Sequence, residues 1–427
     1  MARGLLVLKV ASAVLVPPLL MTAGAPAAAA ARGAAAEAQV APAPQPTAAA
    51  GAGEPRRPCP APNPPVARPS RPAAPPLDPA RAAVGGPELA TAGLVTPPGV
   101  ATPPKVTATS WLVADLTSGA VLGGCGPHEY GIPASVQKLL LAAAVMPRLD
   151  PARMIEVTES DLDFEPGSSA VGLVDGGRYS VETLWLGLLL NSGNDAANVL
   201  ARLGGGAGGV PGGVAAMNAE ARQLGAYQTH AATPSGLDGP GQYTSAYDLA
   251  LIARACFARS DFRRYAATQL AQVPAQKAYN TKGYPIWNDN QLLHRYPGAL
   301  GGKTGYTDLA RHSFVGAAER NGRTLLVTLL GAETPPLAGW QQGAALLDWG
   351  FGLPASAKVG QLVSRGQLDS RGRSPAPAAG AGQAKPNDDR RSRTRWPLFA
   401  GIPVAVLSGL LILILVRRRF GRRPTGR

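Results

Sequence analysis

Two different spacings of apolar residues divide the middle of the chain into strand-like and helix-like segments. Residues 110–126 (SWLVADLTSGAVLGGCG) read as two short strands around a polar turn at 117–119. Residues 313–332 predict a second hairpin, in which SFVGAAE and RTLLVTLLGA are joined at residues 320–322. We therefore expect strands near both ends of the folded region.

The sequence after the first hairpin mostly has the spacing of helices. The predicted helices are one that follows Ser135 and closes at Pro147, an apolar region at 181–203 broken at 191–194, one at 217–226, one at 246–258 capped by Ser245, and a closing helix at 340–351. The glycine-rich residues 204–213 are interpreted as a flexible joint. Strands early, helices in the middle and strands late predict an α+β fold, an antiparallel sheet flanked by helices.

The segments on both sides of this region have a different composition. Residues 31–105 and 362–395 are dominated by Ala, Pro, Gly and Arg, with few aromatic or β-branched runs. Such sequences bury too little apolar surface to offset their chain entropy, so both are predicted to be disordered linkers. One folded domain of residues 106–361 remains.

Both ends of the chain carry targeting signals. Residues 1–30 combine basic residues, an apolar stretch and small residues, which is typical of a secretory signal peptide; an N-terminal anchor is disfavoured because prolines interrupt a short run. Residues 396–416 include 20 uncharged residues, about 30 Å as a helix, and predict a transmembrane helix rather than a buried core helix. The basic residues 417–427 predict a cytoplasmic tail, which places the domain on the extracytoplasmic side of a single-pass membrane protein.

The net charge of +14 would suit a nucleic-acid partner, but its distribution does not. Between residues 106 and 365 the 19 Lys and Arg residues are balanced by 20 Asp and Glu residues. The excess charge therefore lies in the linkers and the tail, and we expect no nucleic-acid partner.

The cysteine and histidine content gives no metal-binding pattern. Three cysteines, Cys59, Cys125 and Cys256, allow one disulfide and one free thiol, and the sequence does not choose the pair. Cys256 lies in an apolar helical segment and is interpreted as a buried hydrophobic residue. With four histidines and no Cys-x-x-Cys motif, we expect no metal site.

Three polar motifs stand out, and each is ambiguous alone. Ser135, with Lys138 one turn later, suits a helix N-cap as well as a hydroxyl beside its base. Ser192 and Asn194 lie in the apolar region 181–203, where polar residues must cap a helix or line a cleft. Lys303 begins a Lys-Thr-Gly motif. The ordered set S-x-x-K, S-x-N and K-T-G is typical of penicillin-binding proteins and class A β-lactamases.

Longer flanking segments extend this match. They are PASVQK, NSGNDAANVLA, ATPSGLDGPGQYTSAYDLALIARA and the run from Asn288 to Phe314. Over residues 106–352 the sequence resembles the low-molecular-mass serine D-alanyl-D-alanine carboxypeptidases of cell-wall metabolism, peptidase family S11. The resemblance implies a penicillin-binding transpeptidase/β-lactamase-like fold, in which an all-helical subdomain accompanies the sheet.

The resemblance implies a catalytic role for four residues. Ser135 would attack the peptide carbonyl and carry the acyl group. Lys138 would take the serine proton, provided that burial and the second cation Lys303 lower its pKa. Ser192 would pass a proton to the departing D-Ala amine, and Asn194 would orient the substrate and Lys138.

The Lys-Thr-Gly motif has a substrate-binding role on the same pattern. Lys303 and Thr304 would hold the terminal carboxylate of the substrate, and Gly305 would allow a close approach to the backbone. The N–H groups of Ser135 and Tyr306 would form the oxyanion hole. The implied partners are a peptidoglycan pentapeptide ending in D-Ala-D-Ala and β-lactams as covalent inhibitors, with no cofactor.

The sequence also departs from the family pattern. Many members carry a basic residue shortly before the last helix that helps to bind the terminal carboxylate, whereas TPPLAGWQQ here has none. An inactive or weakly active penicillin-binding scaffold protein is one alternative. A β-lactamase is less favoured, because no deacylating Glu in an E-x-x-L-N motif follows Ser192.

Overall fold

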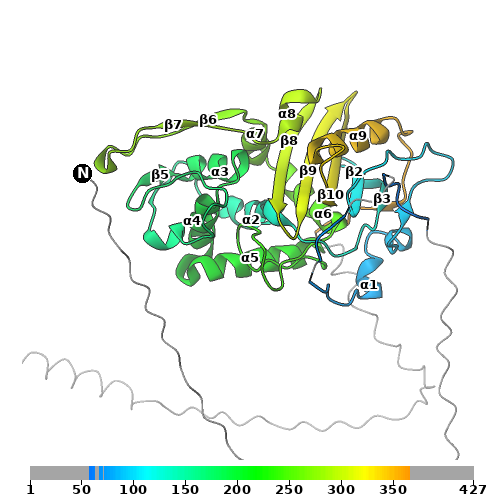
Figure 1. Cartoon of the computed structure of the whole chain (residues 1–427), viewed down its shortest axis with the longest axis horizontal. Coiled ribbons are helices and arrows are strands. Elements are labelled where there is room, and N and C mark those ends of the chain that lie inside the picture. The colour runs from blue at the N-terminus through cyan, green and yellow to red at the C-terminus, as the bar shows by residue number, and fades with distance from the viewer. Residues whose placement is uncertain (1–56, 63–66, 71, 366–427) are drawn as a thin grey trace, which may run out of the picture. The chain divides into compact units, whose positions relative to one another are not determined.

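The computed structural model describes residues 57–62, 67–70 and 72–365 (Figure 1). Its main feature is a seven-stranded antiparallel sheet with the order β1-β3-β2-β10-β9-β8, in which β11 also pairs with β3. Two separate ribbons, β4–β5 and β6–β7, lie outside it. The strands are β1 (Leu94–Val95), β2 (Ser110–Asp115), β3 (Ala120–Cys125), β4 (Met154–Glu156), β5 (Arg178–Ser180), β6 (Leu270–Val273), β7 (Tyr284–Trp287), β8 (Ala299–Thr307), β9 (Arg311–Arg320), β10 (Arg323–Ala332) and β11 (Gly360–Gln361).

Helices cover both faces of this sheet (Figure 1). They are α1 (Pro79–Ala82), α2 (Lys138–Val145), α3 (Val181–Leu190), α4 (Asn194–Gly205), α5 (Gly209–Leu224), α6 (Ala246–Phe257), α7 (Ser260–Ala267), α8 (Gln291–Arg295) and α9 (Gly339–Phe351). Helix α9 packs on β9 and β10, whereas α6 packs on β2 and β10. Helix α2 packs against α6. The predicted α+β architecture, with both hairpins and the closing helix, is confirmed.

Apolar residues on both faces explain why the central strands lack strict alternation. Residues 325–332 of β10 are all buried, because α9 covers one face and α6 the other. On the α9 side Trp111 meets Trp349 edge to face, with ring centroids 6.0 Å apart. On the α6 side the buried Thr328 hydroxyl donates to the Ala246 carbonyl at 2.7 Å, which satisfies the one polar side chain in this run.

The glycine-rich stretch 204–213 differs from the flexible joint expected from composition. Helix α4 continues to Gly205, and α5 begins at Gly209 and runs to Leu224. Glycines bring the two helices close together: a Cβ on Gly213 would collide with the Ala201 backbone, and one on Gly205 with that of Gly213. The absence of side chains therefore serves helix packing at this point.

The predicted linker 31–105 needs correction over its described residues, because part of it packs onto the domain. Leu89 and Leu94 are buried, and β1 pairs with β3. Cys59 forms a disulfide with Cys125 of β3, while the guanidinium of Arg68 donates to the carbonyls of residues 107 and 331. A few anchors of this kind stabilise a segment whose composition alone would not support a core.

The structure identifies the cysteine pair that the sequence left open. Cys59 and Cys125 have Cα atoms 5.8 Å apart, and the third cysteine, Cys256, is a buried free thiol. Burial raises the pKa of the Cys256 thiol, which agrees with its interpretation as a buried hydrophobic residue.

Removing the disulfide is expected to lower the free energy of unfolding by about 2–4 kcal/mol, because it closes a long loop. The two cysteines are 66 residues apart in sequence. Urea unfolding of the wild type, with and without reductant, measures the effect. The Cys59→Ser/Cys125→Ser variant should match the reduced wild type and show no response to reductant. An unchanged wild-type midpoint after complete reduction would contradict the prediction.

Several predicted segments lie outside the described residues. These are the signal peptide 1–30, most of the linker 362–395, the transmembrane helix 396–416 and the tail 417–427. Within the described part of the chain, no helix combines the length and apolar character needed to cross a bilayer.

Candidate active site

Ser135 and Lys138 lie where the chain leaves an extended segment and enters α2. Residues Ala134–Gln137 form a 3₁₀ turn, and the α-helix itself begins at Lys138, two residues after the start expected from the sequence. Ala134 has a left-handed φ of 50°, a strained conformation for a residue with a Cβ. The turn leaves Ser135 partly exposed while Lys138 is fully buried behind it.

The Lys138 ammonium nitrogen has three oxygen neighbours. Its Nζ lies 2.7 Å from Ser135 Oγ, 2.8 Å from Asn194 Oδ1 and 2.9 Å from the Ser235 carbonyl oxygen. A neutral amine has two N–H donors and one lone pair, so it can donate to the amide and the carbonyl and accept from the Ser135 hydroxyl. The three contacts therefore fit a deprotonated lysine positioned as a base.

The environment favours this deprotonated form. Burial lowers the pKa of Lys138 well below its usual value, Lys303 lowers it further, and Asp195 opposes both effects. Burial also lowers the pKa of Lys303, to about 8, against the opposing charge of Asp289.

Ser192 and Asn194 lie at the break between α3 and α4 that the sequence predicts. Ser192 adopts a left-handed φ of 65°, and its buried hydroxyl has no hydrogen-bond partner among the described residues. Asn194 bonds Lys138 through Oδ1 and donates from Nδ2 to Ser168 Oγ at 2.9 Å. A strained serine with an unsatisfied hydroxyl is available to a reacting group.

Strand β8 lies at one edge of the sheet and carries the third motif. The buried Lys303 donates from Nζ to its neighbour's carbonyl, Thr304 O, at 2.8 Å. A Cβ on Gly305 would lie 2.9 Å from the Ser135 amide nitrogen, so only glycine lets the strand approach that N–H. The exposed side chain of Tyr306 follows Gly305 on the strand.

The three motifs meet in one cleft of about 430 Å³. The predicted site residues that line it are Ser135, Ser192, Asn194, Thr304, Gly305 and Tyr306. Lys138 and Lys303 are buried close to this cleft, where each contacts residues that line it. The structure thus brings together all eight residues singled out from the sequence.

Three contributors were missed by the sequence analysis. Ser235 acts through its backbone carbonyl, and the adjacent Gly236 has a left-handed φ of 86°. The Ser168 hydroxyl oxygen accepts a hydrogen bond from the Asn194 amide. The Asp195 carboxylate accepts three hydrogen bonds from the backbone N–H groups of residues 171–173. The glycine and the Asn-Asp pair are sequence signals that could have pointed to two of them.

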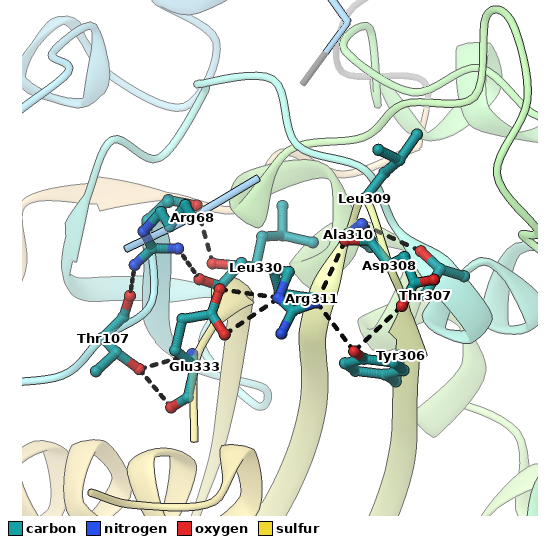
Figure 2. Close-up of polar contacts among 12 residues, drawn as sticks. Arg68, Thr107, Tyr306, Thr307, Asp308, Leu309, Ala310, Arg311, Leu330 and Glu333 are labelled. Atoms are coloured by element: carbon teal, nitrogen blue, oxygen red, sulfur yellow. Dashed lines mark hydrogen bonds and ion pairs between the residues drawn. The ribbon is translucent and has the colours of Figure 1, made fainter. Parts of the chain in front are cut away.

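A polar network continues from the rim of the cleft to the N-terminal segment (Figure 2). Arg311 donates from Nη1 to the Tyr306 hydroxyl at 2.9 Å and from Nε to both oxygens of Glu333, at 2.9 and 3.1 Å. Arg68 lies on the far side of Glu333, and its guanidinium bonds the carbonyls of residues 107 and 331. The N-terminal segment thus contributes to the support of the cleft rim.

Taken alone, this geometry supports acyl transfer. A hydroxyl lies beside a buried amine, a second hydroxyl has no partner, and a glycine exposes a backbone N–H. No group of His, Cys, Asp and Glu side chains suited to a metal ion occurs among the residues that the structure describes.

Comparison with known proteins agrees with the geometry. Residues 98–334 match the Peptidase_S11 family, described as D-alanyl-D-alanine carboxypeptidase. The chain is 44% identical over 273 residues to the D-alanyl-D-alanine carboxypeptidase DacB2 of Mycobacterium tuberculosis, covering 63% of this chain and 90% of that protein. It is 33% identical to DacD of Salmonella typhimurium over 58% of this chain, which spans 64% of that relative's length.

Solved structures of two related proteins are also similar to this chain. A crystal structure of D-alanyl-D-alanine carboxypeptidase from M. tuberculosis matches with a TM-score of 0.59 and 43% identity, over 62% of this chain and 99% of that one. The Streptomyces K15 DD-transpeptidase matches with a TM-score of 0.57 and 27% identity, over 59% of this chain and 100% of that one.

Proposed function

The chain belongs to the D-alanyl-D-alanine carboxypeptidase family Peptidase_S11, and from that membership we propose how its residues remove the terminal D-Ala of a peptidoglycan stem peptide. It is a serine-type D-Ala-D-Ala carboxypeptidase, a hydrolase of the penicillin-binding-protein-like fold that also binds β-lactams. Scaffold and β-lactamase functions are not favoured, because DacB2 and DacD are both named D-alanyl-D-alanine carboxypeptidases.

The first half of the reaction forms an ester on Ser135. Neutral Lys138 takes the Ser135 proton while Oγ attacks the carbonyl carbon between the two D-Ala residues. The N–H groups of Ser135 and Tyr306 stabilise the resulting oxyanion. The C–N bond then breaks, and Ser192 relays the proton from Lys138 to the departing D-Ala amine. One acyl-enzyme and one free D-Ala result.

The second half hydrolyses this ester. Water gives one proton to Lys138 as its oxygen attacks the acyl carbon, and the proton returns to Ser135 Oγ as the C–O bond breaks. During the first half of the reaction Lys303 and Thr304 hold the terminal carboxylate of the substrate, which leaves with the released D-Ala. In a β-lactam the departing amine stays attached, so the acyl-enzyme persists.

The observation that carries this proposal is the 2.7 Å contact of Lys138 Nζ with Ser135 Oγ, combined with the depressed pKa of the lysine. We expect the purified protein to release D-Ala from a pentapeptide ending in D-Ala-D-Ala and to be labelled by fluorescent penicillin. Mass spectrometry of a digest should map the adduct to Ser135. Labelling without D-Ala release would support the scaffold alternative, and rapid release of hydrolysed penicillin would support a β-lactamase.

We further propose that residues 396–416 anchor the protein in the membrane and that the catalytic domain lies on the cell-wall side. The uncharged sequence PLFAGIPVAVLSGLLILILV followed by RRRFGRR supports this orientation. Protease added to intact spheroplasts should digest the domain, whereas recovery of all of the protein in the soluble fraction would contradict the anchor.

A further inference from the structure

The substrate of this reaction ends in a carboxylate next to the scissile bond, and the cleft must bind that charge. Among the residues that line the described cleft, the charged or titratable side chains are those of Asp289, Tyr306 and His312. Asp289 would repel a carboxylate, and the phenol of Tyr306 has no cationic form. His312 is therefore the cleft-lining side chain that can carry a positive charge.

The position of His312 suits a contact with the end of the substrate. It lies opposite Tyr306 in the β8–β9 pair, with ring centroids 4.8 Å apart. Thr304 is two residues from Tyr306 on the same strand and so shares its face of the sheet. No described residue forms a hydrogen bond with the His312 ring in the structure, although the side chain is half-buried.

The segment before α9 leaves space beside this histidine. A Cβ on Gly339 would lie 3.6 Å from the Cβ of His312, so the first residue of α9 has no side chain at the position nearest to it. Residues 334–340 include no charged side chain. The segment 334–340 therefore supplies no cation to a carboxylate bound beside His312.

Arg311 is a weaker candidate for the same role. Its Nε is bonded to both Glu333 oxygens, and its Nη1 is directed to the Tyr306 hydroxyl (Figure 2). Glu333 therefore compensates the Arg311 charge, and Arg311 does not line the cleft.

Resting on the function proposed above, we propose that His312 binds the terminal carboxylate of the substrate and that its protonation strengthens this contact. The charged groups around the ring are Arg311 on its own strand and Glu333 after β10; Tyr306 faces it from β8, and the start of α9 presents no charge. Burial and then Arg311 lower the pKa of free His312, while Glu333 opposes them.

The sign of the pH dependence follows from these groups. A bound carboxylate favours protonated His312. Substrates with a free C-terminal carboxylate should therefore gain affinity as the pH falls through the range in which histidine becomes protonated. A charge-assisted hydrogen bond exceeds a neutral one by roughly 1.4 kcal/mol, or tenfold in affinity. Lys303, with a pKa of about 8, titrates above this range.

The test compares two substrates on the full-length protein: a peptide ending in D-Ala-D-Ala and the same peptide with a C-terminal carboxamide. The ratio of their kcat/KM values cancels the titration of Lys138, which affects both. In the wild type this ratio should fall about tenfold from pH 5 to pH 7. His312→Gln should give a low ratio that does not change with pH, and His312→Arg a high one that does not change.

His230→Gln serves as the matched control, because this exposed histidine lies outside the cleft and its variant should keep the wild-type profile. A His312→Gln protein that retains the wild-type pH dependence of the ratio would overturn the assignment. Such a result, with D-Ala still released, refutes the role of His312 alone. If the wild type releases neither D-Ala from the acid peptide nor D-alaninamide from the amide peptide, the proposed function is refuted and this inference with it.

Discussion

Replacement of Ser135 by alanine is expected to eliminate covalent penicillin labelling and to lower D-Ala release on the order of 10⁶-fold. The substitution removes only the hydroxyl group, whose oxygen lies 2.7 Å from Lys138 Nζ. Loss of a catalytic serine costs about this much because the remaining groups act through it. In-gel fluorescence and an assay of free D-Ala measure the two effects.

A matched serine controls for effects of the substitution itself. Ser260 is exposed at the start of α7 and does not line the cleft, so Ser260→Ala should behave as the wild type. The Ser135→Ala variant should keep the wild-type unfolding midpoint, since the side chain is partly exposed. Continued labelling of that variant would refute the assignment of Ser135 as the nucleophile.

Replacement of Lys138 by methionine is expected to slow acylation by roughly 10²–10⁴-fold, the usual contribution of a general base. Methionine preserves the apolar stem in a fully buried position but cannot accept a proton. It also leaves the Asn194 and Ser235 oxygens without their donor, so some loss of stability should accompany the effect on rate. Stopped-flow penicillin acylation measures the rate.

The pH profile separates loss of the base from loss of structure. Lys138 must be deprotonated to act, so wild-type acylation should rise with pH through the depressed pKa of this lysine and reach a plateau. The Lys138→Met variant should lack this rise, whereas Lys277→Met, at an exposed lysine, should keep it. A variant that acylates slowly but with the wild-type pH profile would exclude Lys138 as the titrating base.

The like charge of Lys303 also affects the pH profile of acylation. Because Lys303 lowers the pKa of Lys138, neutralising Lys303 should move the rise in acylation to higher pH.

The parts of the fold that sequence predicts are those in which side-chain type determines structure. The β9–β10 hairpin follows from two apolar runs around Asn321 and Gly322, and the α3–α4 break follows from polar residues in an apolar region. The site was recognisable because hydroxyl, amine and glycine groups occur in a fixed order. The structure brings the three motifs that carry these groups together in one cleft.

The parts that sequence does not predict depend on backbone atoms or on distant partners. Every residue has a carbonyl, so the Ser235 carbonyl that holds Lys138 has no signature of its own beyond the neighbouring Gly236. The pairing of Cys59 with Cys125 depends on tertiary proximity, as does the docking of Arg68 beside Glu333. A composition rich in Ala and Pro gave no sign that these residues would be held to the domain.

Strand β3 also determines how the domain would bear mechanical tension. A pull on the chain before Cys59 reaches β3 through a covalent bond, and a pull beyond Gln361 reaches the same strand in part, through β11. Both loads would thus meet in one strand of the sheet, four strands away from β8 in the order β3-β2-β10-β9-β8. Tension applied to the two ends of the described domain would load β3 directly, on the side of the sheet opposite to the Lys-Thr-Gly motif of β8.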